Sequence, residues 1–316
     1  MAEAECSSAL EAYSIAFDCS RAAVPRAAVD VRLCSSHARR VDSDLETSIL
    51  AEWAAQLHAH PRMFNGRKFR YGRVAATARG GVRFELGLTD YRSMVGTNSS
   101  ARWSELERRD PSLLANPVGN GAIVETSDGC VVLLQRSKTL LEAPGMWVFP
   151  GGHAEPKSVG IEGWGTAELA AHEQRRADAG DAVGTDVEQR IGTELFASIR
   201  REVVEEIGIA ESELCGGKLP EQLFLGVVKR TDGVRYNTAF VMRCARSSDE
   251  ILARYATPGA AVDAYESTRV VAIPIASLDA RAAELAMPGC HRGMLELYAR
   301  HVAARRAAAA PYYCCS

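Results

Sequence analysis

The sequence of 316 residues contains no long apolar run, and its first residues lack the pattern typical of a secretory leader. No stretch approaches the roughly 20 apolar residues that cross a bilayer. The first residues, MAEAECSSALEAYSIAF, lack a basic region followed by an apolar one. We therefore expect a soluble, cytoplasmic protein without a membrane partner.

Long runs of basic residues and C-x-x-C pairs are also lacking. The 37 Lys and Arg residues nearly balance the 40 Asp and Glu residues, and none of the basic clusters is long enough to follow a phosphate backbone. Nucleic acid is therefore excluded as a partner. The nine cysteines are scattered without a C-x-x-C pair, which predicts reduced thiols rather than a zinc site or a disulfide framework. The composition leaves the oligomeric state undetermined.

The chain length and a change of pattern near residue 113 predict two domains. Residues 1–112 are expected to form a small α+β domain, with an amphipathic helix within 43–60, a β-hairpin within 68–91 and a helix that ends before Pro111.

Residues 113–316 are expected to form the larger domain. A hairpin turns at Asp128 and Gly129, an insertion rich in Gly, Ala and charge spans about 157–192, and a helix starts near Glu194. Two further strands, a late strand and one or two closing helices follow. Because strands and helices do not alternate strictly, we expect a mixed sheet flanked by helices, in the α+β class.

The helix ELFASIRREVVEEIGI carries an unusual group of acidic residues. Its apolar residues recur at four-residue spacing and predict one buried face: Leu195, Ile199, Val203 and Ile207. On the other side Glu202, Glu205 and Glu206 lie within about one turn, and Gly208 ends the helix. The spacing predicts that three carboxylates converge.

Such a cluster repels itself unless a cation lies within it, and oxygen ligands suit Mg²⁺ above all. Arg201 precedes Glu205 by four residues and would hold that carboxylate while the other two bind metal. The alternative interpretation is a solvated face, which is common for acidic residues beside an arginine.

The upstream segment FPGGHAEP favours a ligand site. Gly151 and Gly152 let the backbone turn tightly and approach a ligand after an apolar strand, and His153 and Glu155 stand at the tip of this turn.

Together, FPGGHAEP and REVVEEIGI resemble the signature of the Nudix hydrolases, which runs as Gly, five residues, Glu, seven residues and then R-E-apolar-x-E-E-x-G-apolar. The resemblance covers the chain from about residue 117 to its end. It implies a Nudix α/β/α sandwich with a mixed sheet, and hydrolysis of a pyrophosphate bond with Mg²⁺, or alternatively Mn²⁺, as cofactor.

Two features depart from this signature. About forty residues separate Glu155 from the helix, and the early helical glutamate falls at Glu194, with six residues rather than seven before Arg201. The assignment of Glu194 as a metal ligand is therefore left open.

Four segments are similar to the Nudix branch that cleaves uridine diphosphate glucose and galactose: KFRYGRV, ELGLTDYRSMVGTN, RSKTLLEAPGMWVFPGGHAEP and YESTRVVAIPI. That branch also has an N-terminal domain and a split box. The resemblance implies a small-molecule nucleotide sugar as partner, and UMP and a sugar 1-phosphate as products. Glucose and galactose are not distinguished.

The resemblance further implies roles for individual residues. The substrate-binding positions are Phe64, Tyr91, Arg136, Gly152, His153 and Glu155. The metal ligands are Glu202, Glu205 and Glu206. The catalytic positions are Arg201, Glu202, Glu205, Glu206 and Glu266. The two aromatic rings would stack on uracil and the guanidinium would grip phosphate oxygens. The proton acceptor is either Glu202 or Glu205.

A purely structural role is the alternative interpretation for some of these residues. An aromatic residue beside a hairpin is often part of the core, and Glu266 also suits a plain turn. Two rival functions are a Nudix hydrolase of another nucleoside diphosphate derivative, such as ADP-ribose, coenzyme A or a dinucleoside polyphosphate, and a nucleotide-sugar sensor without turnover.

Overall fold

The structure is a computed structural model that describes residues 12–61, 63–140, 142–180, 185–215, 221–257 and 266–309. Within these ranges six cysteines are free thiols, as expected, whereas Cys6, Cys314 and Cys315 lie outside them. No helix in the described part of the chain is long and apolar enough to cross a membrane.

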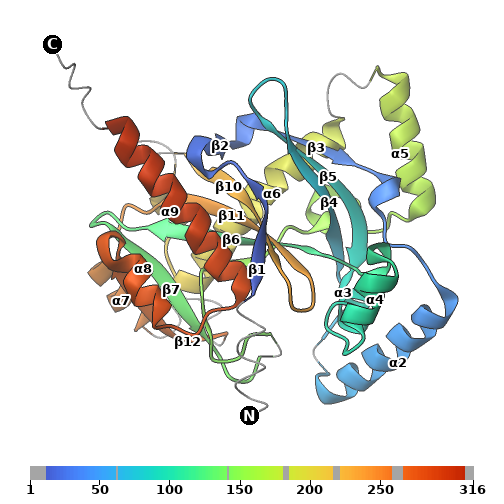
Figure 1. Cartoon of the computed structure of the whole chain (residues 1–316), viewed down its shortest axis with the longest axis horizontal. Coiled ribbons are helices and arrows are strands. Elements are labelled where there is room, and N and C mark those ends of the chain that lie inside the picture. The colour runs from blue at the N-terminus through green and yellow to red at the C-terminus, as the bar shows by residue number, and fades with distance from the viewer. Residues whose placement is uncertain are drawn as a thin grey trace.

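Two sheets organise the molecule (Figure 1). The strands are β1 (Tyr13–Asp18), β2 (Val24–Pro25), β3 (Val29–Leu33), β4 (Arg67–Ala76), β5 (Val82–Asp90), β6 (Val118–Glu125), β7 (Cys130–Arg136), β8 (Trp147–Val148), β9 (Gly151–His153), β10 (Leu223–Arg230), β11 (Arg235–Arg243) and β12 (Ser267–Pro274). The large sheet has the order β1-β10-β11-β6-β7-β12, with β2 on β10, β9 on β6 and β8 on β7. Its pairs are antiparallel except β11 and β6, so it is the expected mixed sheet. The small sheet has the order β3-β5-β4.

Helices cover both faces of the large sheet. They are α2 (Ser43–Ala59), α3 (Tyr91–Gly96), α4 (Trp103–Arg109), α5 (Thr166–Asp178), α6 (Asp186–Ile207), α7 (Ser248–Tyr255), α8 (Leu278–Ala283) and α9 (Gly289–Ala309). Residues of α6 share one hydrophobic cluster with β10 and β11, and residues of α9 share another cluster with the same strands. This arrangement is an α/β/α sandwich.

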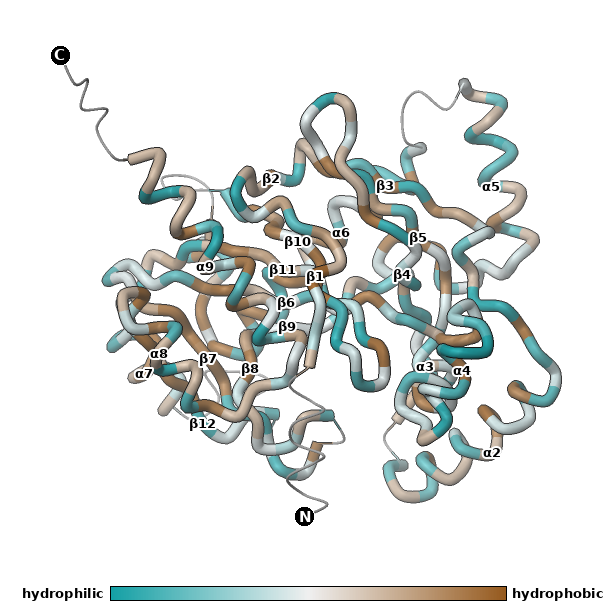
Figure 2. The backbone as a smooth tube through the Cα atoms, viewed as in Figure 1, coloured by the Kyte–Doolittle hydropathy of each residue, from teal (hydrophilic) through white to brown (hydrophobic). Residues whose placement is uncertain are grey.

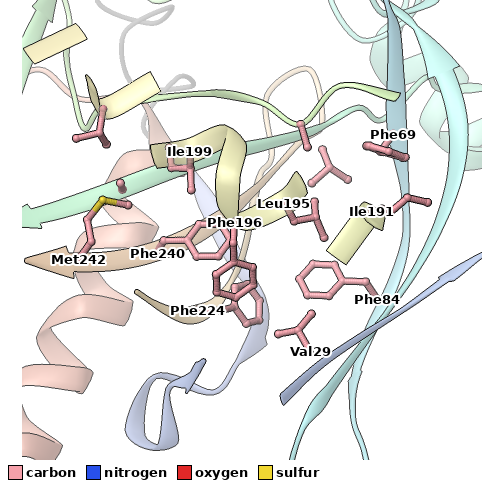
Figure 3. Packing of buried hydrophobic residues seen from close by; sticks show 14 of the residues in the cluster. Val29, Phe69, Phe84, Ile191, Leu195, Phe196, Ile199, Phe224, Phe240 and Met242 are labelled. Atoms are coloured by element: carbon pink, nitrogen blue, oxygen red, sulfur yellow. The ribbon is translucent and has the colours of Figure 1, made fainter. Parts of the chain in front are cut away.

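A run of aromatic rings joins the small sheet to the large one (Figure 3). The ring centroid of Phe84 in β5 lies 5.1 Å from that of Phe224 in β10, which lies 5.7 Å from that of Phe240 in β11. Phe196 of α6 meets Phe240 edge-on at 4.9 Å. Such pairs add to the stabilisation from buried apolar area. Figure 2 shows the hydrophobic stretches concentrated in the strands, whereas α5 at the edge of the molecule has hydrophilic stretches.

The helix α6 begins at Asp186, earlier than the start expected near Glu194. Thr185 caps it, and the backbone N–H of Thr185 donates to Glu188 in return. Glu188 also accepts bonds from the backbone N–H of Leu33 (3.0 Å) and from Arg176 (2.7 Å). The last residues of the expected insertion are therefore helix, and they hold α6 against β3 and α5.

The expected boundary near residue 113 is wrong for the first strands. β1 and β2 belong to the large sheet, where both pair with β10. Only β3, β4 and β5 form the separate small sheet. The first strand completes a sheet whose other members come later in the chain, so the large sheet includes residues from within 1–112.

The hairpin expected around Asp128 and Gly129 forms only at its turn. β6 and β7 pair at a single position, Glu125 with Val131. Beyond it the strands diverge, because β9 pairs with β6 and β8 pairs with β7. The gap brings the glycine segment Gly151–His153 into the sheet beside β6.

Candidate active site

Five glutamates among the described residues line one cavity of about 300 Å³. Three of them come from α6 and from the residue just before β12, and we call these three the carboxylate set: Glu202, Glu206 and Glu266. The first two are one turn apart on α6, and Glu266 directly precedes β12. The backbone carbonyl of Glu266 accepts a bond from the N–H of Ser137 at 2.7 Å. The helix and the strand end therefore deliver all three side chains to the same space.

Glu206 is buried at the base of this cavity, with 5% of its surface exposed. The N–H of Gly151 donates to its Oε2 at 2.9 Å. Burial, together with the negative charges of Glu202 and Glu266, raises the pKa of Glu206 to about 8 against the lowering effect of the Gly151 bond. This mutual repulsion is the kind that a divalent cation relieves.

Glu202 lies directly against β9. A Cβ atom added to Gly152 would stand 1.9 Å from Oε1 of Glu202. A side chain at position 152 would collide with the Glu202 carboxylate in its present position, so glycine at this position lets Glu202 lie close to the backbone of β9. The sequence pattern predicted a close approach of this backbone to a ligand.

Glu205 does not belong to the carboxylate set. It is half-buried, and it is not among the residues that line the cavity. Glu202 and Glu206 share a helix face, whereas Glu205 is turned about 100° from Glu206. Among the described residues no three His, Cys, Asp or Glu side chains lie close enough together to hold a metal ion. The expected convergence of three helical carboxylates is therefore absent from the described residues.

Arg201 pairs with Glu194 rather than with Glu205. Its Nη2 donates to Oε1 of Glu194 at 2.6 Å, and the N–H of Glu155 approaches the same oxygen at 3.4 Å. Side chains on a helix tilt toward its N-terminus, so Arg201 reaches back two turns along α6. Glu194 thereby links α6 to the loop after β9.

Three guanidinium groups line the same cavity, and we call them the arginine set: Arg136, Arg230 and Arg235. Only Arg136 was expected from the sequence. Its Nε donates to the carbonyl of Glu142 at 2.9 Å. The other two are buried, 5% and 9% exposed, and they flank the turn between β10 and β11. Their one signal in the sequence is a pair of arginines bordering the turn TDGV.

Lys68 of β4 also lines the cavity, together with His153 and Glu155. Its Nζ lies 3.7 Å from Oε1 of Glu155. Burial, followed by the Lys68 cation, lowers the pKa of His153 to about 3, so the imidazole is neutral near pH 7. Sequence reasoning missed Lys68, because a lysine within a strand carries no distinctive pattern.

A second cavity, of about 620 Å³, adjoins the first one and shares Lys68 and His153 with it. Phe64 and Tyr91 line this second cavity. The Phe64 side chain is 69% exposed, so it is not part of the core. The structure therefore brings together the two aromatic residues that the sequence comparison singled out.

Comparison with known proteins agrees with this geometry. The chain is 36% identical over 301 residues to Nudix hydrolase 9 of Arabidopsis thaliana, and the match covers 90% of each chain. The chain belongs to the Nudix hydrolase family. The resemblance seen in its sequence is confirmed, and this Nudix hydrolase has the expected α+β fold.

Relatives of the uridine diphosphate glucose branch also match this Nudix hydrolase. Uridine diphosphate glucose pyrophosphatase NUDT22 of Homo sapiens is 29% identical over 269 residues, 81% of each chain. Its Mus musculus counterpart is 31% identical over 254 residues, 77% of this chain and 75% of the other. A solved MutT protein from Methanosarcina mazei Go1 is 17% identical, covers 58% of this chain and 94% of its own, and has a TM-score of 0.32. A TM-score this low supports no conclusion. No family model matches the chain.

Proposed function

We propose that this Nudix hydrolase cleaves the pyrophosphate bond of uridine diphosphate sugars to give UMP and a sugar 1-phosphate. The exposed ring of Phe64 carries the proposal, because it stands with Tyr91 in a cavity that shares Lys68 and His153 with the carboxylate cavity. An aromatic ring that is exposed in a cavity lining is accessible to a ligand, and a uracil offers a flat face to stack on it. The NUDT22 relatives favour the same substrate class.

Glu202 and Glu206 are the residues that would hold a divalent cation, Mg²⁺ or alternatively Mn²⁺. The carboxylates of half-buried Glu202 and buried Glu206 repel each other, and this pair fits such an ion. When bound, the ion supplies charge neutralisation on the phosphate oxygens and lowers the pKa of water. The roles of Glu205 as a metal ligand and of Arg201 as a catalytic residue stay predictions. Arg201 would act indirectly by fixing Glu194 and, through it, the loop that bears Glu155.

In the proposed reaction, water attacks one phosphorus atom while the bridging P–O bond breaks. Glu202 is better placed than Glu205 to take the proton of the water, because Glu202 lines the cavity. Glu266 is a second candidate for this role. Arg136 would orient phosphate oxygens by its planar fork, and neutral His153 and Glu155 would contact phosphate or sugar hydroxyl groups.

A substrate panel tests the proposal. Purified protein with Mg²⁺ would be followed by ³¹P NMR against UDP-glucose, UDP-galactose, ADP-ribose, ADP-glucose, a diadenosine polyphosphate and coenzyme A. Selective conversion of the UDP-sugars to UMP and sugar 1-phosphate is the expected result. Preferred turnover of another substrate would reject the uridine specificity, and binding of UDP-glucose without any turnover would indicate a sensor.

Substitution of Phe64 sharpens this test. Phe64→Ala should raise KM for UDP-glucose by about tenfold, because base–aromatic stacking contributes roughly 1–3 kcal/mol, with little change in thermal stability. Leu50→Ala is the matched control, since Leu50 is also exposed, at 53%, but lies on α2 and outside the cavity lining. Equal effects of the two substitutions would reject the uracil contact.

A further inference from the structure

Arg230 and Arg235 have no role in the chemistry proposed so far. Both are more than nine-tenths buried and both line the carboxylate cavity. Nη2 of Arg235 donates to Oγ of Ser99 at 2.9 Å, whereas its Nη1 is buried and has no hydrogen-bond partner within the described residues. Nε of Arg230 donates to the carbonyl of Asp232 at 2.8 Å. A buried guanidinium nitrogen without a partner is costly, which favours an anionic ligand that completes it.

The carboxylate of Glu142 lies between the guanidinium groups of Arg230 and Arg235. Oε1 of Glu142 lies 3.2 Å from Nε of Arg235 and 3.6 Å from Nη1 of Arg230. The Glu142 side chain is 45% exposed and belongs to the loop between β7 and β8. Asp232, whose Oδ2 lies 4.0 Å from Nη2 of Arg230, is the other carboxylate nearby. Rotating an exposed side chain outward costs little compared with moving either buried arginine.

Backbone strain at the β10–β11 turn supports a functional role for this pair. Val234 is buried and has a φ of 48°, which is unfavourable for a β-branched residue. Asn98 holds the turn, because its Nδ2 donates to the carbonyls of Gly233 at 3.1 Å and Val234 at 2.7 Å. Strain of this kind persists where neighbouring structure enforces it, often at ligand sites. Here it sets the positions of the two arginines.

A third cavity, of about 440 Å³, continues beyond the arginines and shares Glu142, Arg230 and Arg235 with the carboxylate cavity. Amide and hydroxyl groups line it, including Gln56, Asn98 and Ser100. Side chains of this kind suit a ligand that carries several hydroxyl groups.

We propose that Arg230 and Arg235 form a second anion subsite that takes a phosphoryl group attached to a hydroxyl-rich moiety, and that Glu142 fills this subsite until the phosphoryl group displaces it. The identification of that group with the sugar 1-phosphate half of the substrate rests on the proposed function. The anion subsite itself does not.

Isothermal titration of the full chain with inorganic phosphate, glucose 1-phosphate and, for comparison, UMP, without divalent ions, tests this subsite. Glu142→Gln should lower Kd for inorganic phosphate and glucose 1-phosphate by about tenfold, because it removes the competing charge, and adding Arg235→Gln should raise Kd again by about tenfold. Glu107→Gln is the matched control. Oε1 of Glu107 lies 2.7 Å from Nζ of Lys229, the residue that precedes Arg230. Glu107→Gln therefore removes a nearby paired negative charge that does not line the cavity.

The outcomes separate the subsite from the proposed function. Affinities that are the same in Glu142→Gln and Glu107→Gln, or that Arg235→Gln leaves unchanged, overturn the subsite. If the variant with Arg235→Gln fails to fold, the comparison of Glu142→Gln with Glu107→Gln still tests whether the anion subsite exists. Tightening for UMP but not for glucose 1-phosphate would overturn the assignment to the hydroxyl-rich half. Tightening for both phosphate compounds in a protein that does not hydrolyse UDP-glucose would keep the subsite and reject the proposed function.

Discussion

The carboxylate set and the arginine set line the same cavity, but the chain builds them by different means. Glu202 and Glu206 take their relative positions from one turn of α6, and Gly152 lets them approach β9. Arg230 and Arg235 instead flank a strained turn, and the segment just after α3 holds this region in place: Asn98 bonds to the turn and Ser99 accepts a bond from Arg235. Local helix geometry is therefore enough to pair the carboxylates, whereas the arginines depend on contacts between distant segments.

The largest expected effect tests the carboxylate set. Glu206→Gln should lower kcat on the preferred substrate by on the order of 100-fold or more, because a neutral amide binds a divalent cation poorly. The charge that develops on the phosphate oxygens in the transition state would then be stabilised less well. Circular dichroism should show a retained fold, and Glu211→Gln, an exposed change beyond the end of α6, is the control. Turnover near the wild-type level at saturating Mg²⁺ would reject Glu206 as a metal ligand.

A smaller loss should follow from crowding the same set. Gly152→Ala places a methyl group against Glu202 and should lower kcat by about tenfold or more, since small displacements of catalytic groups are costly. Gly163→Ala is the matched control, because a Cβ at Gly163 meets no atom within 4 Å. If steady-state kinetics show the same kcat for both variants, close packing of Glu202 on β9 is irrelevant to the reaction.

The anchoring of α6 predicts a pH effect on stability. Burial raises the pKa of Glu188, but the nearby His172 ring, at 3.4 Å, and hydrogen bonds from the Thr185 and Leu33 N–H groups and from Arg176 outweigh it and lower the pKa to about 2. The stabilisation is therefore complete above the unfolded pKa of about 4.5 and is lost as pH falls toward 2. Glu188→Gln should cost about 2 kcal/mol at pH 7. Denaturant unfolding should show that this difference shrinks at pH 3, and a difference independent of pH would contradict the assignment.

The smallest expected effect tests the arginine set. Asn98→Asp replaces an N–H₂ donor by an acceptor that faces the carbonyls of Gly233 and Val234, and should cost roughly 1–3 kcal/mol of stability. It should also weaken glucose 1-phosphate binding severalfold while leaving Glu206-dependent chemistry in place. Gln174→Glu, an amide change on the exposed side of α5, is the control. Unchanged glucose 1-phosphate affinity would show that the turn does not position Arg235.

Sequence reasoning located Glu202 and Glu206 of the carboxylate set because these two residues are close together in the chain. The motif REVVEEIGI contains the helix face, the acidic residues and the terminal Gly208, so spacing alone was informative. The position of Glu205 was harder to predict, and its role stays a prediction. Glu205 lies beside Glu206 in sequence but on another face of α6, and a residue count cannot tell which of two adjacent carboxylates enters a cavity.

The arginine set was largely beyond prediction. Arg235 owes its position to Ser99 and Arg230 to the turn at Gly233, which Asn98 holds. Such contacts join residues that are far apart in sequence, and a single chain gives no signal of them. The same reason explains the late start assigned to α6, because Glu188 finds its partners in β3 and α5. The division into residues 1–112 and 113–316 stays a prediction for the small sheet, while β1 and β2 contradict it.

The pairing of β1 with β10 has a consequence for how the chain folds. Tyr13 is opposite Arg230, so the first strand waits for a partner that leaves the ribosome about 200 residues later. Such long-range pairing slows folding, because an extensive loop must close before the contact contributes any stability. A truncated chain that begins at residue 113 would leave β10 as an unprotected sheet edge, and we expect such a product to aggregate during expression.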